Sequence, residues 1–211
     1  YYNSFATEIG QSISVTTSNQ LYLAVSWGLK PVPVNGSPAD LVYTEAKNVL
    51  RRIIDDSMSD ADKVQAIYNY LSTEIYYDSQ LLSLSMLPNA LQPANLHFYE
   101  GFYLEGVFLR GSAVCDGIAK AFNLLAYMEG IEALKISGEA MNSSNQLIGH
   151  AWNMVLLDGK WYAVDATWAS IQDGNKELPT YRYLLVTDEK LQSSHFALGT
   201  YPPTELENLN F

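Results

Sequence analysis

Cys115 is the single cysteine among the 211 residues, and it is the strongest candidate for a nucleophile. It stands in the first turn of a helix predicted over residues 114–130, between Gly111 and Gly117, which would let another backbone come close. The positive end of a helix dipole favours the thiolate, the reactive form of cysteine. The alternative interpretation is a small buried apolar side chain, which describes most free cysteines. A catalytic role therefore depends on a base nearby.

A predicted β-hairpin brings such a base next to an acid. Residues 150–157 and 160–168 are strand-like and are joined by an Asp-Gly pair, a strong signal for a two-residue turn. A turn of that length pairs residues whose numbers sum to 317, so that Trp152 faces Asp165. Because strand side chains alternate between faces, His150 and Asp165 become diagonal neighbours within hydrogen-bond reach. The hairpin therefore predicts a carboxylate that holds the imidazole in one tautomer.

A thiol, an imidazole and a carboxylate together would make a nucleophile, its base and an orienting group. Spacing alone does not place Cys115 beside His150, so a purely structural histidine–aspartate hydrogen bond stays open as an alternative. We expect His97 and His195 to be structural or surface residues, because one general base suffices. The sequence contains no spacing typical of a metal site, and we expect neither a metal nor an organic cofactor.

Around these residues the sequence resembles the transglutaminase-like superfamily of papain-like cysteine enzymes. Three stretches carry the resemblance. Residues 111–122 are similar to the nucleophile helix of that family, residues 149–155 to its histidine strand, and residues 161–168 to its aspartate strand. The resemblance implies that Cys115 is the nucleophile, His150 the general base and acid, and Asp165 the orienting carboxylate. It also implies an α+β fold, with the cysteine-bearing helix packed on an antiparallel sheet that carries the other two residues. Ala166 departs from the family pattern, which usually has a proline there.

Flanking stretches extend the resemblance over roughly residues 40–200. Residues 62–78 look like the helix that precedes the core in bacterial members, and residues 183–195 look like their closing strand. We therefore expect a bacterial member of the family, and a secreted or cell-surface protein.

The chain divides into two predicted parts. Residues 1–37 form an N-terminal extension and linker, either an edge piece packed on the main domain or the tail of an upstream domain. Residues 38–211 form the transglutaminase-like catalytic domain. The predicted elements are β-prone stretches over 12–17 and 21–27, helices over 42–53, 59–75 and 114–130, loops and short turns over 76–103, and strands over 131–137, 150–157, 160–168 and 181–187.

Charge and composition exclude several classes of function. The formal net charge of −11 argues against nucleic-acid binding, which needs clustered lysines and arginines. The sequence has no apolar run near the roughly 20 residues that span a bilayer, so we expect no membrane insertion of this chain. Hydrophobic residues make up 48%, which is enough for a substantial core. The oligomeric state is not readable from these features.

The expected chemistry is thiolate attack on an amide carbonyl, followed by release of the amine and hydrolysis of a thioester. We therefore expect a cysteine-dependent amide hydrolase of the peptidase or amidase type, acting on a protein or peptide. Protein-glutamine crosslinking by the same triad is one alternative, and a non-catalytic binding or scaffold module of a cell-surface protein is another. The backbone N–H of Cys115 is one expected donor to the oxyanion, and Tyr103, Trp152 and Asn153 are candidates for the second.

Overall fold

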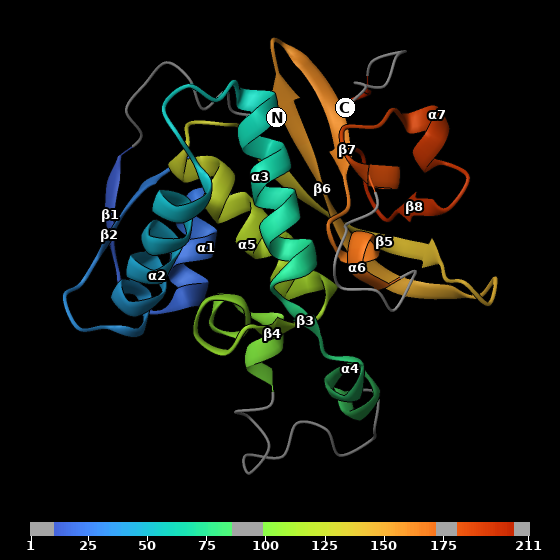
Figure 1. Cartoon of the computed structure of the whole chain (residues 1–211). Helices are drawn as coiled ribbons and strands as arrows, with labels where there is room; N and C mark the ends of the chain where they lie inside the picture. Colours follow the sequence, from blue (N-terminus) through green and yellow to red (C-terminus); the bar gives the residue numbers. More distant parts are fainter. Residues whose placement is uncertain (1–10, 86–98, 172–180, 205–211) are drawn as a thin grey trace.

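The computed structural model of the chain describes residues 11–85, 99–171 and 181–204, so the expectation for His97 lies outside the described residues. Figure 1 shows most helices gathered on one side of the molecule and a larger sheet on the other. That sheet has four strands, all antiparallel to their neighbours. This separation of helices from an antiparallel sheet confirms the predicted α+β class. None of the described helices is long and apolar enough to cross a membrane.

The N-terminal part contains a helix where the sequence pattern predicted a strand. Strand β1 (Ser12–Val15) pairs in parallel with β2 (Lys30–Pro33), and helix α1 (Ser18–Ser26) connects them. The prediction of a β-prone stretch over 21–27 is therefore wrong. Thr17 and Gln20 form a reciprocal capping box that starts the helix. The residues that α1 buries join the main core, and the division at residue 37 stays a prediction.

Three longer helices follow the predicted spacing. They are α2 (Pro38–Ile53), α3 (Asp60–Thr73) and α5 (Cys115–Met128). The side chain of Ser59 accepts from the backbone N–H of Asp62, and the carboxylate of Asp62 accepts from the N–H of Ser59, which confirms the predicted cap of α3. Gly130 follows α5 in the left-handed region, at φ 75°, where glycine is favoured.

The segment before α5 fixes where that helix begins. Strand β3 (Tyr76–Tyr77) pairs in parallel with β4 (Ser112–Ala113), directly before the cysteine. Helix α4 (Ser79–Ser85) follows β3, where loops and turns were predicted, and the one-turn π-helix η2 (Gly106–Arg110) precedes β4. The backbone N–H of Val114 donates to the carbonyl of Gly101 at 3.0 Å. Gly117 lies so close to that carbonyl that a β-carbon would clash with it. The start of α5 is therefore held on several sides.

The larger sheet has the order β7-β6-β5-β8, with β5 (Ala133–Met141), β6 (Leu147–Leu157), β7 (Lys160–Val164) and β8 (His195–Ala197). The hairpin between β6 and β7 has the predicted register, from the pair Leu157 and Lys160 to the pair Asn153 and Val164. Strand β7 ends earlier than predicted, because helix α6 (Thr167–Ile171) begins where the strand was expected to continue.

The predicted strand over 181–187 is wrong for most of its length. Residues Tyr181–Tyr183 form a 3-10 helix, η3, and Val186 makes a single β-bridge with Ala163. Helix α7 (Asp188–Leu191) follows, and the chain then enters β8, which begins only at the last residue of the stretch 183–195 that resembled a closing strand. Three residues are too few for a periodic signal, and β8 takes its place by pairing with β5.

Helix α5 packs on β5 and β6, and this contact places the cysteine near the hairpin. Apolar side chains of the helix and of one face of the sheet share the main core. The opposite face of the sheet carries a second, smaller core that includes Trp152, Trp168 and Tyr183. The site described next lies where the start of α5 meets the hairpin.

Candidate active site

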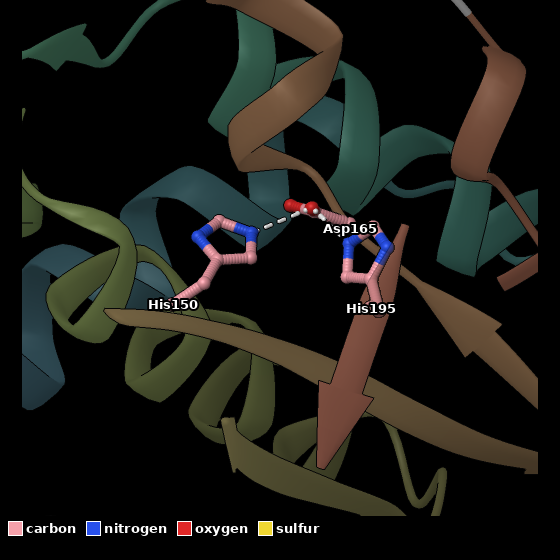
Figure 2. A group of neighbouring side chains, drawn as sticks. All are labelled: His150, Asp165 and His195. Carbon is pink, nitrogen blue, oxygen red and sulfur yellow. Dashed lines mark hydrogen bonds and ion pairs between the residues drawn. The ribbon is translucent and has the colours of Figure 1, made fainter. Parts of the chain in front are cut away.

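The hairpin brings His150 and Asp165 into direct contact. His150 lies on β6, and Asp165 follows the last residue of β7. The Nε2 atom of His150 is 2.8 Å from Oδ2 of Asp165, and both side chains are almost completely buried. Figure 2 shows the carboxylate between the imidazole of His150 and a second imidazole, that of His195. The predicted histidine–aspartate pair is therefore present.

The early end of β7 gives Asp165 two further donors. Because the chain turns into α6, Oδ1 of Asp165 accepts from the backbone N–H of Thr167 at 2.9 Å and from that of Trp168 at 3.2 Å. Burial alone would raise the pKa of Asp165, but the charge of His150 and the hydrogen bonds from both histidines hold that pKa well below its ordinary value. Asp165 is therefore a carboxylate at neutral pH.

The sequence analysis expected His195 to be a structural or surface residue, and it did not predict that this histidine lies against Asp165. It is fully buried, and its Nε2 atom lies 3.1 Å from the same Oδ2 of Asp165. No spacing along the chain connects position 195 with the hairpin, since the contact arises from the pairing of β8 with β5.

His150 is set up to carry a positive charge. Burial lowers its pKa, but the charge and hydrogen bond of Asp165, together with the hydrogen bond and charge of Cys115, raise the pKa of His150 to about 10. The ring lies between aromatic neighbours, with the Trp168 centroid at 4.8 Å and the Trp152 centroid at 6.1 Å. Because Nε2 bonds Asp165, Nδ1 is the ring nitrogen left for the thiol.

Cys115 begins α5 and is 7% exposed. Its side chain packs with Ala119, one helical turn further on, with Ala151 of β6 and with Tyr77 of β3. Ala151 is the neighbour of His150 in β6, and the charge of the thiol contributes to the raised pKa of His150, so Cys115 lies beside the pair of His150 and Asp165.

Tyr77 is a further side chain at the thiol, which the sequence analysis did not single out. Its hydroxyl interacts with both the thiol and the backbone N–H of Cys115. Burial, and after it the charges of Cys115 and Asp165, raise the pKa of Tyr77, so the phenol stays protonated. Its position follows from the pairing of Tyr77 with Ala113, two residues before the cysteine.

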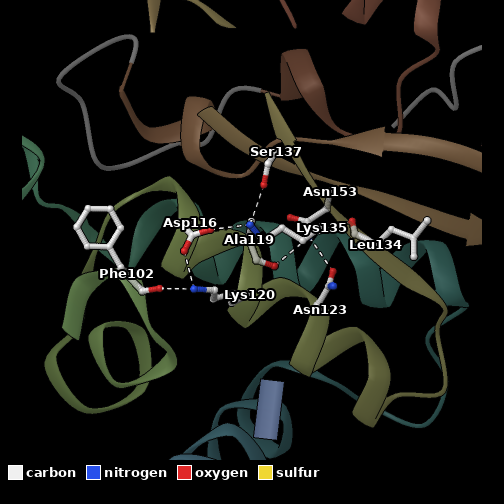
Figure 3. Close-up of polar contacts among 9 residues, drawn as sticks. All are labelled: Phe102, Asp116, Ala119, Lys120, Asn123, Leu134, Lys135, Ser137 and Asn153. Carbon is white, nitrogen blue, oxygen red and sulfur yellow. Dashed lines mark hydrogen bonds and ion pairs between the residues drawn. The ribbon is translucent and has the colours of Figure 1, made fainter. Parts of the chain in front are cut away.

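Polar side chains tie α5 to the sheet beside the site, as Figure 3 shows. Asp116 accepts from Lys120 and from Lys135, each at 2.6 Å, so the helix is joined to β5 by an ion pair. The two lysines lower the pKa of Asp116 against the effect of its burial. The amide of Asn153 donates to the carbonyl of Ala119 at 2.9 Å and to Oδ1 of Asn123 at 2.8 Å, which joins the helix to β6.

The three candidates for a second oxyanion donor have other surroundings. Both amide hydrogens of Asn153 are used in the bonds to α5. The ring of Tyr103 contacts Lys120, whose Nζ atom lies 4.9 Å from the ring centroid. The indole N–H of Trp152 is buried and has no hydrogen-bond partner among the described residues, and its ring packs against the two imidazoles. The described contacts thus place none of the three against Cys115.

Among the described residues, His150, Asp165 and His195 are the one group with ligand atoms close enough to hold a metal ion, all within 4.8 Å of one another. Hydrogen bonds account for this closeness. A carboxylate only accepts, so each imidazole Nε2 must carry the proton it donates and has no lone pair for an ion. The donor set therefore fits a hydrogen-bonded cluster.

Comparisons with known proteins agree with this arrangement. Residues 47–166 match the family model described as the transglutaminase-like superfamily. The kyphoscoliosis peptidase of Mus musculus is 24% identical over 153 residues, which cover 69% of this chain and 21% of that protein. The kyphoscoliosis peptidase of Homo sapiens is 24% identical over 164 residues, which cover 72% of this chain and 22% of that protein.

A solved structure described as a TGase is 26% identical, with a TM-score of 0.47, and covers 68% of this chain and 34% of the other. The chain spans about a fifth of the length of the two curated relatives. The family match supports a cysteine-dependent enzyme in general.

Proposed function

Because this chain belongs to the transglutaminase-like superfamily, we propose that it is a cysteine-dependent amide hydrolase that cleaves a protein or peptide through a thioester. Cys115 is the nucleophile, His150 the general acid and base, and Asp165 the orienting carboxylate. The observation that carries the proposal is the buried pair of His150 and Asp165 at 2.8 Å, beside the helix start that carries Cys115. The word peptidase in the relatives' names favours hydrolysis over crosslinking.

The reaction begins with a thiolate and an imidazolium. The raised pKa of His150 keeps that ring protonated at neutral pH, with one N–H on Asp165 and the other toward Cys115. The thiolate sulfur attacks the amide carbonyl carbon and forms a tetrahedral oxyanion. The carbon–nitrogen bond then breaks, and the imidazolium transfers its Nδ1 proton to the departing amine. A thioester and a neutral imidazole remain.

Water completes the cycle. The neutral His150 takes a proton from a water molecule, and the hydroxide attacks the thioester carbonyl carbon. The carbon–sulfur bond breaks, the carboxylic acid leaves, and the thiolate–imidazolium pair is restored. An amine in place of water would give crosslinking by the same steps, so the acceptor distinguishes the two reactions.

Two groups are suited to hold the oxyanion. The backbone N–H of Cys115, at the start of α5, is the first, because helix N-termini stabilise negative charge. The hydroxyl of Tyr77 is the second, since it lies beside that N–H and keeps its own hydrogen to donate. Removing one such donor typically lowers kcat by about 100- to 1000-fold. We therefore expect Tyr77→Phe to lower kcat on this scale, and by more than it changes the Cys115 alkylation rate.

The decisive experiment measures the rate of alkylation by iodoacetamide against pH. With one cysteine in the chain, the rate reports Cys115 alone. We expect a pH midpoint below the roughly 8.5 of a free cysteine thiol in the unmodified protein, and a return toward that value in His150→Ala and Asp165→Asn. A slow reaction with the free-cysteine midpoint in all three proteins would contradict the enzyme proposal and favour a binding or scaffold module.

A second experiment separates hydrolysis from crosslinking. Casein and a glutamine-containing peptide are incubated with the protein, and new amino termini and incorporation of a fluorescent primary amine are measured in parallel. Cys115→Ser is the matched control for both signals. New amino termini without amine incorporation would support the hydrolase, and incorporation without cleavage would establish the crosslinking alternative. A bacterial source and a secreted or cell-surface location stay predictions, because both curated relatives are mammalian.

A further inference from the structure

We propose that His195 is a positioning residue for this reaction: it holds Asp165 from the side opposite His150, and so keeps His150 oriented toward Cys115. The inference rests on the proposed function and assigns a role to a residue outside the triad. His195 does not touch the reacting atoms, since its partners are Asp165 and Ser194. It acts through the carboxylate.

Hydrogen-bond chemistry assigns the protons of this cluster. Asp165 only accepts, so Nε2 of His195 carries a hydrogen and donates it across 3.1 Å. With Nε2 as the donor, Nδ1 can accept from the hydroxyl of Ser194, which lies 2.8 Å away. The oxygen of Ser194 is in turn 3.1 Å from the hydroxyl of Tyr183, which is free to donate to it. One consistent set of donors therefore runs from Tyr183 to the carboxylate.

The carboxylate needs this donor because it is buried away from solvent. Asp165 is fully buried, and its four hydrogen bonds match the roughly four lone-pair sites of a carboxylate. Without His195, Oδ2 would keep one donor and the carboxylate would gain freedom to turn on its axis. Its negative charge would also become less favourable in the buried site, which weakens the support for the charge on His150.

A packing role for the second imidazole is the competing explanation. The ring of His195 lies 4.7 Å from that of Trp168 and 5.0 Å from those of Trp152 and Tyr183. A large apolar replacement would disturb both packing and hydrogen bonding. The test therefore replaces His195 by two side chains of similar polarity, whose amide groups lie at different distances from the backbone.

The matched variants are His195→Gln and His195→Asn. The amide nitrogen of glutamine reaches about as far as Nε2 of histidine, so it can still donate to Asp165. The shorter asparagine places its amide near Nδ1 and leaves the carboxylate without this donor. Phe196→Leu, on the same strand and 44% exposed, is the control for local repacking.

The readout is the pH profile of Cys115 alkylation, with the circular dichroism of each variant as a check on folding. We expect His195→Asn to move the pH midpoint upward by about one unit. At pH values below the midpoint, this shift corresponds to an alkylation rate about tenfold lower. His195→Gln and Phe196→Leu should stay within about threefold of the unmodified protein. A merely structural role would not separate the two amides.

Few other titratable side chains lie close to the cluster in the part of the chain that the structure describes. The titratable side chains that face it are Cys115 from α5, His150 from β6, Tyr77 from β3, Tyr68 from α3 and Tyr183 from η3. Burial raises the pKa values of Tyr68 and Tyr77 well above the range of the assay. A shifted midpoint near neutral pH therefore reports the thiol, the imidazoles and the carboxylate.

Three outcomes would overturn the inference. Equal shifts in the Gln and Asn variants would assign His195 to packing. A shift in Asp165→Asn without one in His195→Asn would leave the triad standing and show that His195 does not position Asp165. The free-cysteine midpoint in the unmodified protein, unchanged in His150→Ala, would overturn the proposed function and this inference together.

Discussion

Asn153 tests whether the contact between α5 and β6 is structural or catalytic. Its amide nitrogen donates to the carbonyl of Ala119 at 2.9 Å and to Oδ1 of Asn123 at 2.8 Å, and the side chain is buried. These bonds join the helix that begins with Cys115 to the strand that carries His150. We expect Asn153→Leu, which keeps a similar side-chain volume, to destabilise the fold.

The size of the effect follows from the bonds that are lost. A neutral hydrogen bond contributes about 1 kcal/mol net, and a buried polar atom left without a partner costs about 1–3 kcal/mol. Losing the bond to Ala119 removes the first amount, since that carbonyl also lies within the hydrogen-bonded helix. Losing the bond to Asn123 leaves its Oδ1 buried without this donor and adds the second. We expect a loss of about 2–4 kcal/mol in the free energy of unfolding.

The assay is urea unfolding followed by tryptophan fluorescence. Asn123→Leu is the matched partner, and the double variant closes the cycle. Because the double variant leaves no orphaned Oδ1, it should be less destabilised than the sum of the single changes by about 1–2 kcal/mol. The opposite result would refute the reasoning: an unchanged unfolding free energy in Asn153→Leu, together with a fall in kcat of about 100-fold or more, would make Asn153 an oxyanion donor.

Three further predictions concern the pH dependence of the fold, the space at Gly117 and the cap of α3. Because the pKa of His150 is raised from 6.5 to about 10, its stabilisation of the fold is complete below pH 6.5 and is lost as the pH rises through about 10. The urea midpoint and the amidase rate should therefore fall together as the pH approaches 10. The urea midpoint of His150→Ala should lack this pH dependence. Gly117→Ala should lower the unfolding free energy by about 1–3 kcal/mol and slow alkylation, because its β-carbon meets the backbone carbonyl of Gly101. Gly149→Ala, with open space at that position, should do neither. Ser59→Ala removes the cap of α3 and should cost about 1 kcal/mol in urea unfolding with an unchanged alkylation profile.

The sequence could predict the contact of His150 with Asp165 because a short turn joins β6, which carries His150, to β7, which Asp165 directly follows. A two-residue turn fixes the register of a hairpin, and the alternation of side chains then fixes which residues meet. That reasoning needs only the turn and the two stretches beside it, so it predicts the contact of His150 with Asp165. It does not predict that β7 stops at Val164, where the start of α6 supplies two donors to the carboxylate.

Other elements were misplaced because the periodic signal was too short. Residues 21–27 contain β-prone side chains, yet Leu21, Ala24 and Val25 are buried at helical spacing, and the cap formed by Thr17 and Gln20 decides for the helix. The stretch over 181–187 is apolar enough for a strand, but tertiary contacts divide it between a 3-10 turn and a single bridge. The position of Cys115 beside the imidazole depends on how α5 packs, which no spacing contains.

Small residues on β5 decide whether the second histidine can reach the carboxylate. Gly138 pairs with His150 on one neighbouring strand, and Ala140 pairs with His195 on the other. Because strand side chains alternate, these four positions share one face of the sheet. A β-carbon at Gly138 would clash with the backbone carbonyl of Phe196 on β8 and with the ring of Trp152. Ala140 is fully buried, so a larger side chain at either position would displace β8 or the indole that packs on both imidazoles. The site thus depends on a strand that carries none of its functional groups, and a pattern confined to the hairpin can predict one imidazole of the cluster but not the other.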